Sequence, residues 1–293
     1  MIGKSQAQVD QVSAETEPLL KDRYRRCYDK IASDDLVQPL ESGKDARNLP
    51  LLSWIGDARG KRVLDVGSAQ GLLLDSLGRA KARVCADLAG PYLRVARAKE
   101  HAAVQADGEH LPFEPAVFDV VVCTGVLEHV LDPSAVVQEV RRVLAPGGRF
   151  YVLVPWEEDI TKYGKDPGAY EFAHLRSFTD EVVRSLFQGF EEVRRRGVEP
   201  NVACPPHEKL LNLLPGPAIA WLRWIYRRAW VLFDYLEGRW KWRLPRRIQY
   251  AYWRWYWKQL AEFPKRDWLW LRMYPPFHMV FELRPLSAEQ AER

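Results

Sequence analysis

The sequence has few of the features that mark secreted, membrane-spanning or zinc-binding proteins. Only four of its 293 residues are cysteine (Cys27, Cys85, Cys123 and Cys204), and no two of them form a CxxC pair. Such isolated cysteines are typical of reduced thiols in a cytoplasmic protein. The longest uncharged apolar stretch, 210–222, has 13 residues, whereas a membrane-spanning helix needs about 20. The first 30 residues are polar and charged, so we expect a cytoplasmic chain without a signal peptide or a membrane span.

A strong excess of one charge and the usual phosphate-binding motifs are also missing. The formal net charge of +4 is too small to indicate nucleic-acid binding. In the dinucleotide pattern G-x-G-x-x-G that would start at Gly67, Ala69 and Leu72 occupy the second and third glycine positions. The motif G-x-x-x-x-G-K-[ST] is absent as well. These absences argue against a dinucleotide or nucleoside-triphosphate site of the usual kind.

What the sequence does contain is an alternation of short apolar strands and helices. The predicted strands are 61–66, 83–87, 103–106, 118–123 and 149–154, and the predicted helices among them are 71–79, 91–99 and 133–144. These strands run continuously apolar, as strands do when both faces of a sheet are covered. We therefore predict an α/β fold with a doubly wound, mostly parallel, Rossmann-like sheet.

Further elements are predicted on either side of this core. A helix over 15–33 precedes it, after residues 1–14, which we expect to be disordered, and a loop with Pro39, Gly43 and Pro50 follows that helix. Beyond the core we expect a helix over 179–187 capped by Thr179, a sixth strand over 190–198 and a last strand over 276–283.

Acidic residues and glycines follow the predicted strands, at the edge where parallel sheets bind their ligands. Asp65, Gly67 and Gly71 belong to the first strand end, Asp87 to the second and Asp107 to the third. Glycine permits a sharp turn and a close ligand approach. An acid 20 residues after Gly67 can accept hydrogen bonds from ribose hydroxyls, and a further acid can accept one from an exocyclic amino group. Each acid alone could be a helix cap, but together they favour a nucleoside-like ligand.

These motifs resemble those of class I S-adenosylmethionine-dependent methyltransferases. VLDVGSAQG at 63–71 is similar to the first motif of that superfamily, and the resemblance continues over about residues 60–198 and the last strand. The other similar segments are ADLAG (86–90), ADGEHLPF (106–113), FDVVVCTGVLEHVLDP (118–133), LAPGGRFYVLVP (144–155) and HLRSFTDEVVRSLF (174–187). The resemblance implies a methyltransferase with S-adenosyl-L-methionine as cofactor.

The resemblance also implies which residues bind the cofactor. The turn after the first strand would hold the methionine part of the cofactor, and the end of the fourth strand would contact it as well. The end of the second strand would bind the ribose and pack against the adenine ring. The segment after the third strand would bind the adenine amino group. In chain order, these residues are Asp65, Gly67, Ala69, Gly71, Asp87, Leu88, Asp107, Gly108 and Thr124. Ala69 departs from the superfamily pattern, in which glycine is commoner.

The acceptor side offers several groups that could take a proton. Glu128 and His129 follow the fourth strand, and Tyr170 and His174 follow the fifth. Methylation of a hydroxyl benefits from a general base, and we expect His174 first and His129 second as the catalytic residue. Each histidine could instead be structural. A sulfonium methyl group is already activated, so no metal is predicted.

The N-terminal helix carries two tyrosines, Tyr24 and Tyr28, that suggest a lid. We expect this helix to fold over the cofactor.

Ten of the twelve tryptophans lie between Trp221 and Trp270. Within this stretch, 217–237 is predicted as an amphipathic helix, and 221–247 holds eight Lys or Arg against two acids. Residues 217–270 could dock on a membrane and gather a lipid-linked acceptor, because tryptophans and cations suit the lipid headgroup region. They could also form an aromatic cap over a soluble acceptor, or a helical subdomain or dimer surface. Nucleic acid is disfavoured by the low net charge.

The chain is thus expected to divide into an N-terminal helical extension (1–60), a cofactor-binding domain (61–198), an aromatic and basic insertion (199–275) and a final strand with its tail (276–293). The expected acceptor is a small or lipid-linked molecule. O-methylation of a saccharide or glycolipid is the first expectation, and a prenylated quinone or other small aromatic is the alternative. A non-catalytic module that docks a membrane or protein partner is the alternative of another class.

Overall fold

The computed structural model describes residues 17–36, 46–161, 172–200 and 276–287. Contacts divide the chain into one unit of residues 1–44, 48–196 and 280–293 and a second of residues 45–47 and 197–279. The sites considered below lie in the first unit. The predicted domain boundaries at 199 and 275 stay predictions.

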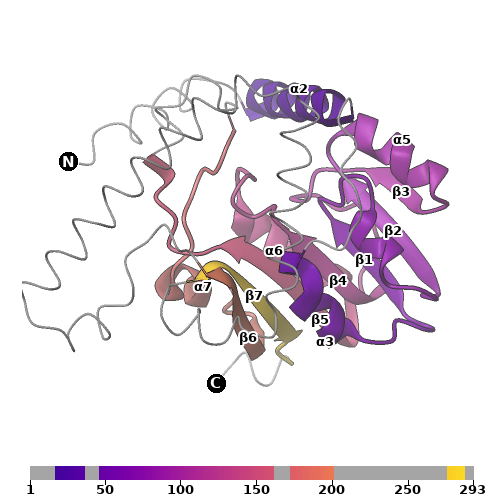
Figure 1. Cartoon of the computed structure of the whole chain (residues 1–293), viewed down its shortest axis with the longest axis vertical. Coiled ribbons are helices and arrows are strands. Elements are labelled where there is room, and N and C mark those ends of the chain that lie inside the picture. Colours follow the sequence, from indigo (N-terminus) through magenta and orange to yellow (C-terminus); the bar gives the residue numbers. More distant parts are fainter. Residues whose placement is uncertain (1–16, 37–45, 162–171, 201–275, 288–293) are drawn as a thin grey trace, which may run out of the picture. The chain divides into compact units, whose positions relative to one another are not determined.

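The described residues contain a seven-stranded sheet with the order β3-β2-β1-β4-β5-β7-β6 (Figure 1). Its strands are β1 (Arg62–Val66), β2 (Ala82–Asp87), β3 (Ala102–Gln105), β4 (Phe118–Thr124), β5 (Leu144–Pro155), β6 (Phe190–Pro200) and β7 (Pro276–Pro285). β1 pairs in parallel with both β2 and β4, and the pairs β2–β3 and β4–β5 are also parallel. This confirms the predicted doubly wound sheet. Strand order reverses between β1 and β4, which is where such sheets bind ligands.

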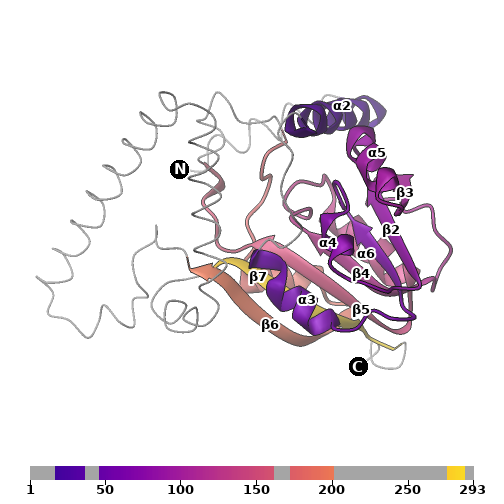
Figure 2. The same cartoon turned by 45° about the vertical axis from the view of Figure 1, so that its right-hand side comes forward.

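Helices precede the sheet and connect its strands. They are α2 (Glu17–Leu36), the 3₁₀ turn η1 (Ala46–Asn48), α3 (Leu49–Ile55), α4 (Leu72–Asp75), α5 (Gly90–Ala98), α6 (Pro133–Val143) and α7 (Asp180–Leu186). α6 buries a stripe of four valines, and the carboxylate of Asp132 accepts hydrogen bonds from the backbone of its first turn. The hydroxyl of Thr179 accepts a hydrogen bond from Val182 N, which confirms the predicted cap of α7. Figure 2 shows α3 in front of the sheet.

Two predictions of local structure were wrong. The helix expected over 71–79 is only the four-residue α4, and Gly78, with φ +60°, lies beyond its end. Residues 49–55, at the end of the predicted loop, form α3 instead. Pro50 lies in the first turn of α3, where its missing N–H costs nothing. Leu51 and Ile55, four residues apart, bury one side of this helix.

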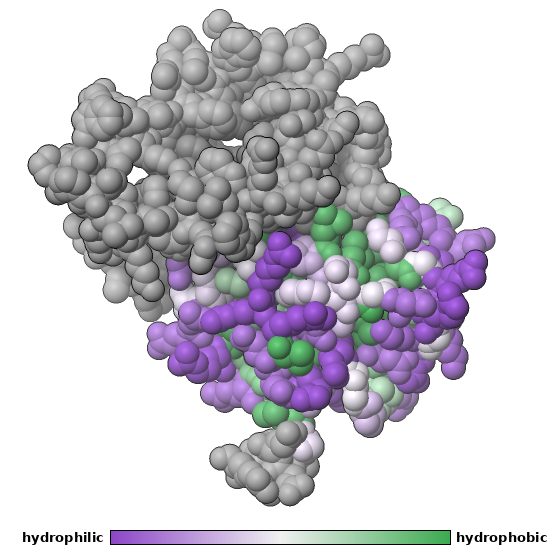
Figure 3. Space-filling model, turned by 60° about the horizontal axis from the view of Figure 1, so that its bottom comes forward, coloured by the Kyte–Doolittle hydropathy of each residue, from purple (hydrophilic) through white to green (hydrophobic). Residues whose placement is uncertain are grey.

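Other predictions lie outside the described residues, namely the disorder of residues 1–14, the helix over 217–237 and the position of Tyr170. Within the described part, no helix is long and apolar enough to cross a membrane. The described residues on the face drawn in Figure 3 are mainly hydrophilic, with hydrophobic areas between the polar side chains.

Candidate active site

The turn between β1 and α4 has a backbone that only small residues can follow. Gly67 and Gly71 have φ of +70° and +71°, in the left-handed region that favours glycine. A Cβ atom on Gly67 would lie 2.2 Å from Cγ2 of Val126, in the loop after β4. The two loops at the reversal of strand order therefore touch. Ala69 adopts φ +45° within the same turn, which is consistent with the glycine expected there.

Asp87, at the end of β2, ties this turn to the next loop. Its Oδ2 accepts a hydrogen bond from Ala69 N and its Oδ1 one from Ala89 N, both at 2.8 Å. Burial raises the pKa of Asp87, and these backbone hydrogen bonds act in the opposite direction. Each carboxylate oxygen can accept more than one hydrogen bond, so Asp87 retains capacity for the hydroxyls of a ribose.

Asp65, on β1, is the most deeply buried of the predicted acids. It is 2% exposed, and its Oδ1 has no hydrogen-bond partner among the described residues. Burial, together with the negative charge of Asp87, raises the pKa of Asp65 to about 8. A buried carboxyl oxygen without a partner is costly, which suits a site completed by a ligand donor. The ammonium group of a methionine moiety is such a donor, so Asp65 fits the expected cofactor.

Asp107, expected to bind the adenine amino group, is engaged by a residue that the sequence did not suggest. Lys21, on α2, donates to Asp107 Oδ2 at 2.7 Å and to Glu109 Oε2 at 2.5 Å. The other oxygen of Glu109 accepts hydrogen bonds from Leu131 N and Asp132 N, both at 3.0 Å. An adenine amino group would therefore share Asp107 with Lys21. The contact between Lys21 and Asp107 could hardly be predicted from the sequence, because α2 and Asp107 are far apart in it.

α2 lies over the strand ends that carry these acids (Figure 1). Tyr24 packs edge-on against Phe172, and the Tyr28 hydroxyl donates to Phe172 O at 3.0 Å. Tyr28 and Leu88 belong to the same apolar cluster as Tyr24, and Tyr28 also packs in a second cluster beside Ala69. This packing supports the predicted lid.

The remaining cofactor-binding candidates surround the same reversal point. Gly108 lies close to β1, since a Cβ atom there would be 3.2 Å from Val66 Cγ1. Thr124 ends β4, and the next residue, Gly125, has φ +66° and donates to Leu153 O. Predicted residues from four strand ends are thus gathered at one edge of the sheet.

The two candidate catalytic histidines are also brought together. The rings of His129 and His174 lie 4.8 Å apart, centroid to centroid, in an edge-on arrangement. Nδ1 of His129 is 3.3 Å from Phe172 O, and Nδ1 of His174 contacts the carboxylate of Glu158. Burial, and next the neighbouring His174, lower the pKa of His129 to about 4, so this ring is neutral near pH 7.

Arg176 holds the two histidine-bearing segments together. Its guanidinium donates to the backbone oxygens of Leu127, Val130 and Leu131, at distances of 2.7, 2.5 and 3.0 Å. Neither Arg176 nor Glu158 was predicted from the sequence as a site residue. Neither belongs to a recognisable local pattern, and their partners become neighbours only in the folded chain.

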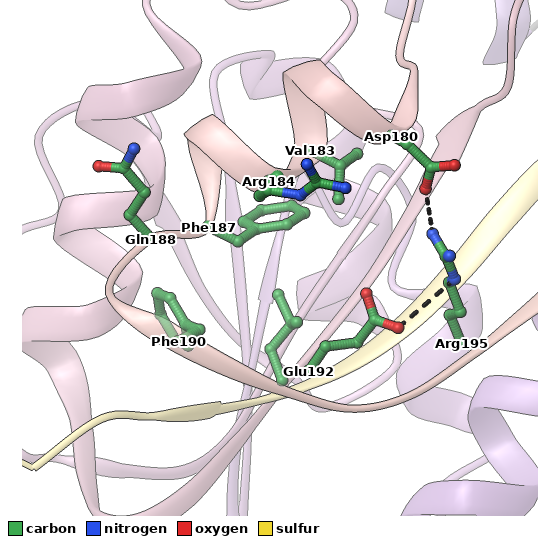
Figure 4. A pocket seen from close by; sticks show the side chains of 9 residues that line it. Asp180, Val183, Arg184, Phe187, Gln188, Phe190, Glu192 and Arg195 are labelled. Atoms are coloured by element: carbon green, nitrogen blue, oxygen red, sulfur yellow. Dashed lines mark hydrogen bonds and ion pairs between the residues drawn. The ribbon is translucent and has the colours of Figure 1, made fainter. Parts of the chain in front are cut away.

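A separate pocket lies between α7 and β6 (Figure 4). Arg195 forms ion pairs there with Asp180 and with Glu192, the latter at 3.4 Å. β6 is at the edge of the sheet, whereas the reversal of strand order is at β1 and β4. The pocket is therefore separate from the cofactor site.

Fold and site together define a nucleoside-binding Rossmann-like domain whose residues fit S-adenosylmethionine. The family described as "Methyltransferase domain" matches residues 64–152, which span β1 to β5. The chain carries a methyltransferase domain of the class I S-adenosylmethionine-dependent superfamily, and S-adenosylmethionine is the cofactor of this class.

Curated relatives and solved structures agree with this assignment. A "Ubiquinone biosynthesis O-methyltransferase" of Xylella fastidiosa is 43% identical over 101 residues, covering 32% of this chain and 41% of the relative. The protein of that name from Xanthomonas oryzae pv. oryzae is 34% identical over 157 residues, covering 48% and 65%. The chain thus spans about two fifths to two thirds of the length of these relatives.

Two solved structures share the fold. A putative methyltransferase from Bacillus halodurans has a TM-score of 0.50 and 18% identity, covering 83% of this chain and all of that one. A chain from the complex of the Haloferax volcanii Trm112 activator with a putative methyltransferase has a TM-score of 0.51 and 22% identity, covering 58% of this chain and 79% of that one. At these identities the likeness concerns the fold alone.

Proposed function

We propose that this chain transfers the methyl group of S-adenosylmethionine to a hydroxyl oxygen of a small aromatic acceptor of the ubiquinone-precursor type. The names of the curated relatives support this acceptor, the alternative expected from the sequence, over a saccharide or glycolipid, which was the first expectation. The observation that carries the proposal is the convergence of Asp65, Asp87 and Asp107 at the switch point of the sheet, with a histidine pair nearby.

In the proposed reaction the cofactor supplies an activated methyl group, and the protein binds and orients the reactants. Asp65 receives the ammonium group of the methionine part, Asp87 the ribose hydroxyls, and Asp107 the adenine amino group. Fixing the acceptor oxygen in line with the methyl group can lower the barrier by roughly 7–11 kcal/mol.

His129 and His174 activate the acceptor hydroxyl in this proposal. His174 would remove the proton from the hydroxyl as a general base, with His129 beside it. General-base catalysis of this kind is worth about 10²–10⁴-fold. Glu158 contacts Nδ1 of His174 and fixes the orientation of its ring.

The test combines calorimetry with turnover. The wild-type chain should bind S-adenosylmethionine and its demethylated product, and it should methylate a catechol-type quinone precursor. His174→Ala should lower turnover by about tenfold or more and leave cofactor affinity unchanged. A wild-type chain that binds neither compound would refute the proposal and favour a non-catalytic docking module. Unchanged turnover in His174→Ala would remove that residue from the mechanism.

A further inference from the structure

A lysine of α2 joins the acid proposed for the adenine amino group to a second, more deeply buried acid. Nζ of Lys21 donates to Asp107 Oδ2 at 2.7 Å and to Glu109 Oε2 at 2.5 Å. The side chain of Glu109 is 6% exposed, against 22% for each of the other two. Burial acts to lower the pKa of Lys21, but its hydrogen bonds with the two acids outweigh burial and raise that pKa. Lys21 is therefore a cation held by both carboxylates.

The other oxygen of Glu109 reaches the loop after β4. This loop, residues 125–132, carries His129 and is hereafter the histidine loop. Oε1 of Glu109 accepts hydrogen bonds from Leu131 N and Asp132 N, both at 3.0 Å. Hydrogen bonds to an ionised acceptor are roughly twice as strong as those between neutral groups. A single buried carboxylate thus connects Lys21 to the backbone of the histidine loop.

α2 touches the histidine loop at a second point. Tyr28 packs edge-on against His129, with ring centroids 6.1 Å apart. The Tyr28 hydroxyl and His129 Nδ1 both face the carbonyl oxygen of Phe172, at 3.0 and 3.3 Å. Lys21 and Tyr28 are about two helical turns apart, so they lie on the same side of α2. One side of this helix therefore contacts both the adenine acid and the histidine loop.

The connection meets the proposed cofactor at Asp107. Oδ1 of Asp107 accepts a hydrogen bond from Glu109 N at 3.0 Å, and each carboxylate oxygen can accept more than one hydrogen bond. An adenine amino group and Lys21 can therefore bind to Asp107 at the same time. An opening of α2 that withdraws Lys21 would leave both carboxylates without their cation, which is costly for a buried charge. We therefore expect the adenine acid and the histidine loop to loosen together when α2 opens.

We propose that Lys21 and Glu109 are positioning residues that couple occupation of the adenine site to the placement of the histidine loop. With the adenine site occupied, α2 stays closed and Lys21 stays on both carboxylates, so Glu109 holds the loop in one position. The acceptor then meets His129 and His174 in a fixed geometry, and in this respect the inference rests on the proposed function. Neither Lys21 nor Glu109 touches the reacting atoms.

Amide hydrogen exchange tests the coupling without an acceptor. Exchange of the Leu131 and Asp132 amides is followed in the full chain, with and without S-adenosylhomocysteine at about ten times its dissociation constant for each variant. A ligand that binds only the closed state slows exchange from the open state by the factor 1 + [L]/Kd, which is about tenfold under these conditions. We expect this slowing in the wild type, and at most about a twofold effect in Lys21→Met and Glu109→Gln, in which the opening of the loop is no longer linked to the ligand.

Three controls accompany these variants. Lys21→Arg keeps a cation that can donate to both carboxylates, so it should restore a slowing of about fivefold or more. Arg25→Met removes another α2 cation, one that pairs with Asp22 of the same helix, and should behave as the wild type does. The Gly125 amide lies next to Thr124, the proposed contact of the methionine end. It should be protected by S-adenosylhomocysteine in every variant, which verifies that the ligand is bound.

Turnover gives a second measurement. With a catechol as acceptor, Lys21→Met and Glu109→Gln should lower kcat by about fivefold, which is at the lower end of typical coupling between two sites. Their affinity for S-adenosylhomocysteine should fall by less than about threefold, because the ligand keeps its contacts with Asp65 and Asp87. A variant that had merely lost structure would lose affinity and turnover together.

Several results would overturn the coupling. One is a slowing at Leu131 that is as large in Lys21→Met and Glu109→Gln as in Arg25→Met, and another is equal kcat in these three variants. Failure of Lys21→Arg to restore any slowing would remove the role of the charge. The proposed function is judged separately. A chain with the expected exchange pattern that methylates no catechol keeps the coupling and loses the proposed acceptor. A chain that methylates the catechol, with equal exchange in all variants, keeps the proposed function and loses the coupling.

Discussion

Asp65 links the stability of the protein to the ligand it is expected to bind. Its carboxyl group has a pKa of about 8 in the folded chain, against an ordinary value of 3.8. Between these values the unfolded chain has released a proton that the folded chain retains. The free energy of unfolding should therefore fall as pH rises from about 4 to about 8, by at most about 1.4 kcal/mol per pH unit from this group, and level off above.

Asp65→Asn tests this effect at the residue itself. Asparagine keeps the shape and the neutral charge of the protonated carboxyl group, so the variant should fold and its stability should depend less on pH. Urea unfolding of both chains at about pH 5.5, 7 and 8.5 measures the difference in slope. The variant should also lose most of its affinity for S-adenosylmethionine, because it cannot become a carboxylate. Equal slopes in the two chains would show that Asp65 is ionised in the folded protein.

At the residue scale, strand-end position was the informative signal in the sequence. Asp65, Asp87 and Asp107 lie together in the structure because parallel strands carry their carboxyl ends to one edge. Partners that depend on folding could not be predicted in this way. Lys21 reaches Asp107 across 86 residues, and Glu158 reaches His174 from a segment without a motif.

At the element scale, α2 is the part whose removal should most affect the cofactor. Lys21 contacts Asp107, and the side chain of Asp29 accepts a hydrogen bond of 3.0 Å from Gly90 N, at the start of α5. Deleting residues 1–30 removes these contacts together with Tyr24 and Tyr28, so S-adenosylmethionine should dissociate faster and bind about tenfold more weakly, which corresponds to about 1.4 kcal/mol.

Stopped-flow release and calorimetry measure this loss, and the matched control is a chain that lacks only residues 1–14, ahead of α2. Tyr28→Ala in the full chain should show a smaller loss in the same direction. Equal affinity and release rate in the 1–30 deletion and in its control would exclude α2 as a lid.

Helices and strands were predicted correctly where the spacing of apolar residues and the length of the apolar segment indicated the same kind of element. The strands from β1 to β4 match the expected segments within one residue, because buried parallel strands are short continuous apolar runs. α3 was missed because Pro50 was interpreted as a loop residue, although proline is common in the first turn of a helix. α4 is shorter than its apolar pattern suggested, since Gly78 follows soon after it.

At the scale of the whole molecule, the chain combines a superfamily domain with an aromatic and basic segment that the matched family does not include. The family match ends at residue 152, and the tryptophan-rich stretch lies between 221 and 270. An acceptor of the quinone-precursor type carries an apolar tail when it is prenylated, so it would reside at a lipid surface. A methyltransferase that acts on it would benefit from a segment that holds it there.

We therefore predict that the full chain binds anionic liposomes through residues 217–270. Each Lys or Arg near an anionic surface contributes about 1 kcal/mol, and the interaction is screened within about 3 Å in 1 M salt. The chain should sediment with anionic vesicles at low salt and much less at high salt.

Replacing Trp253, Trp255 and Trp257 by alanine should reduce sedimentation, because the variant lacks the indole rings that would lie in the headgroup layer. Trp54→Ala, a tryptophan of α3 that contacts Arg194, is the matched control and should bind as the wild type does. Failure of the full chain to sediment at low salt would leave a cap over the acceptor or a subunit interface as the role of this segment.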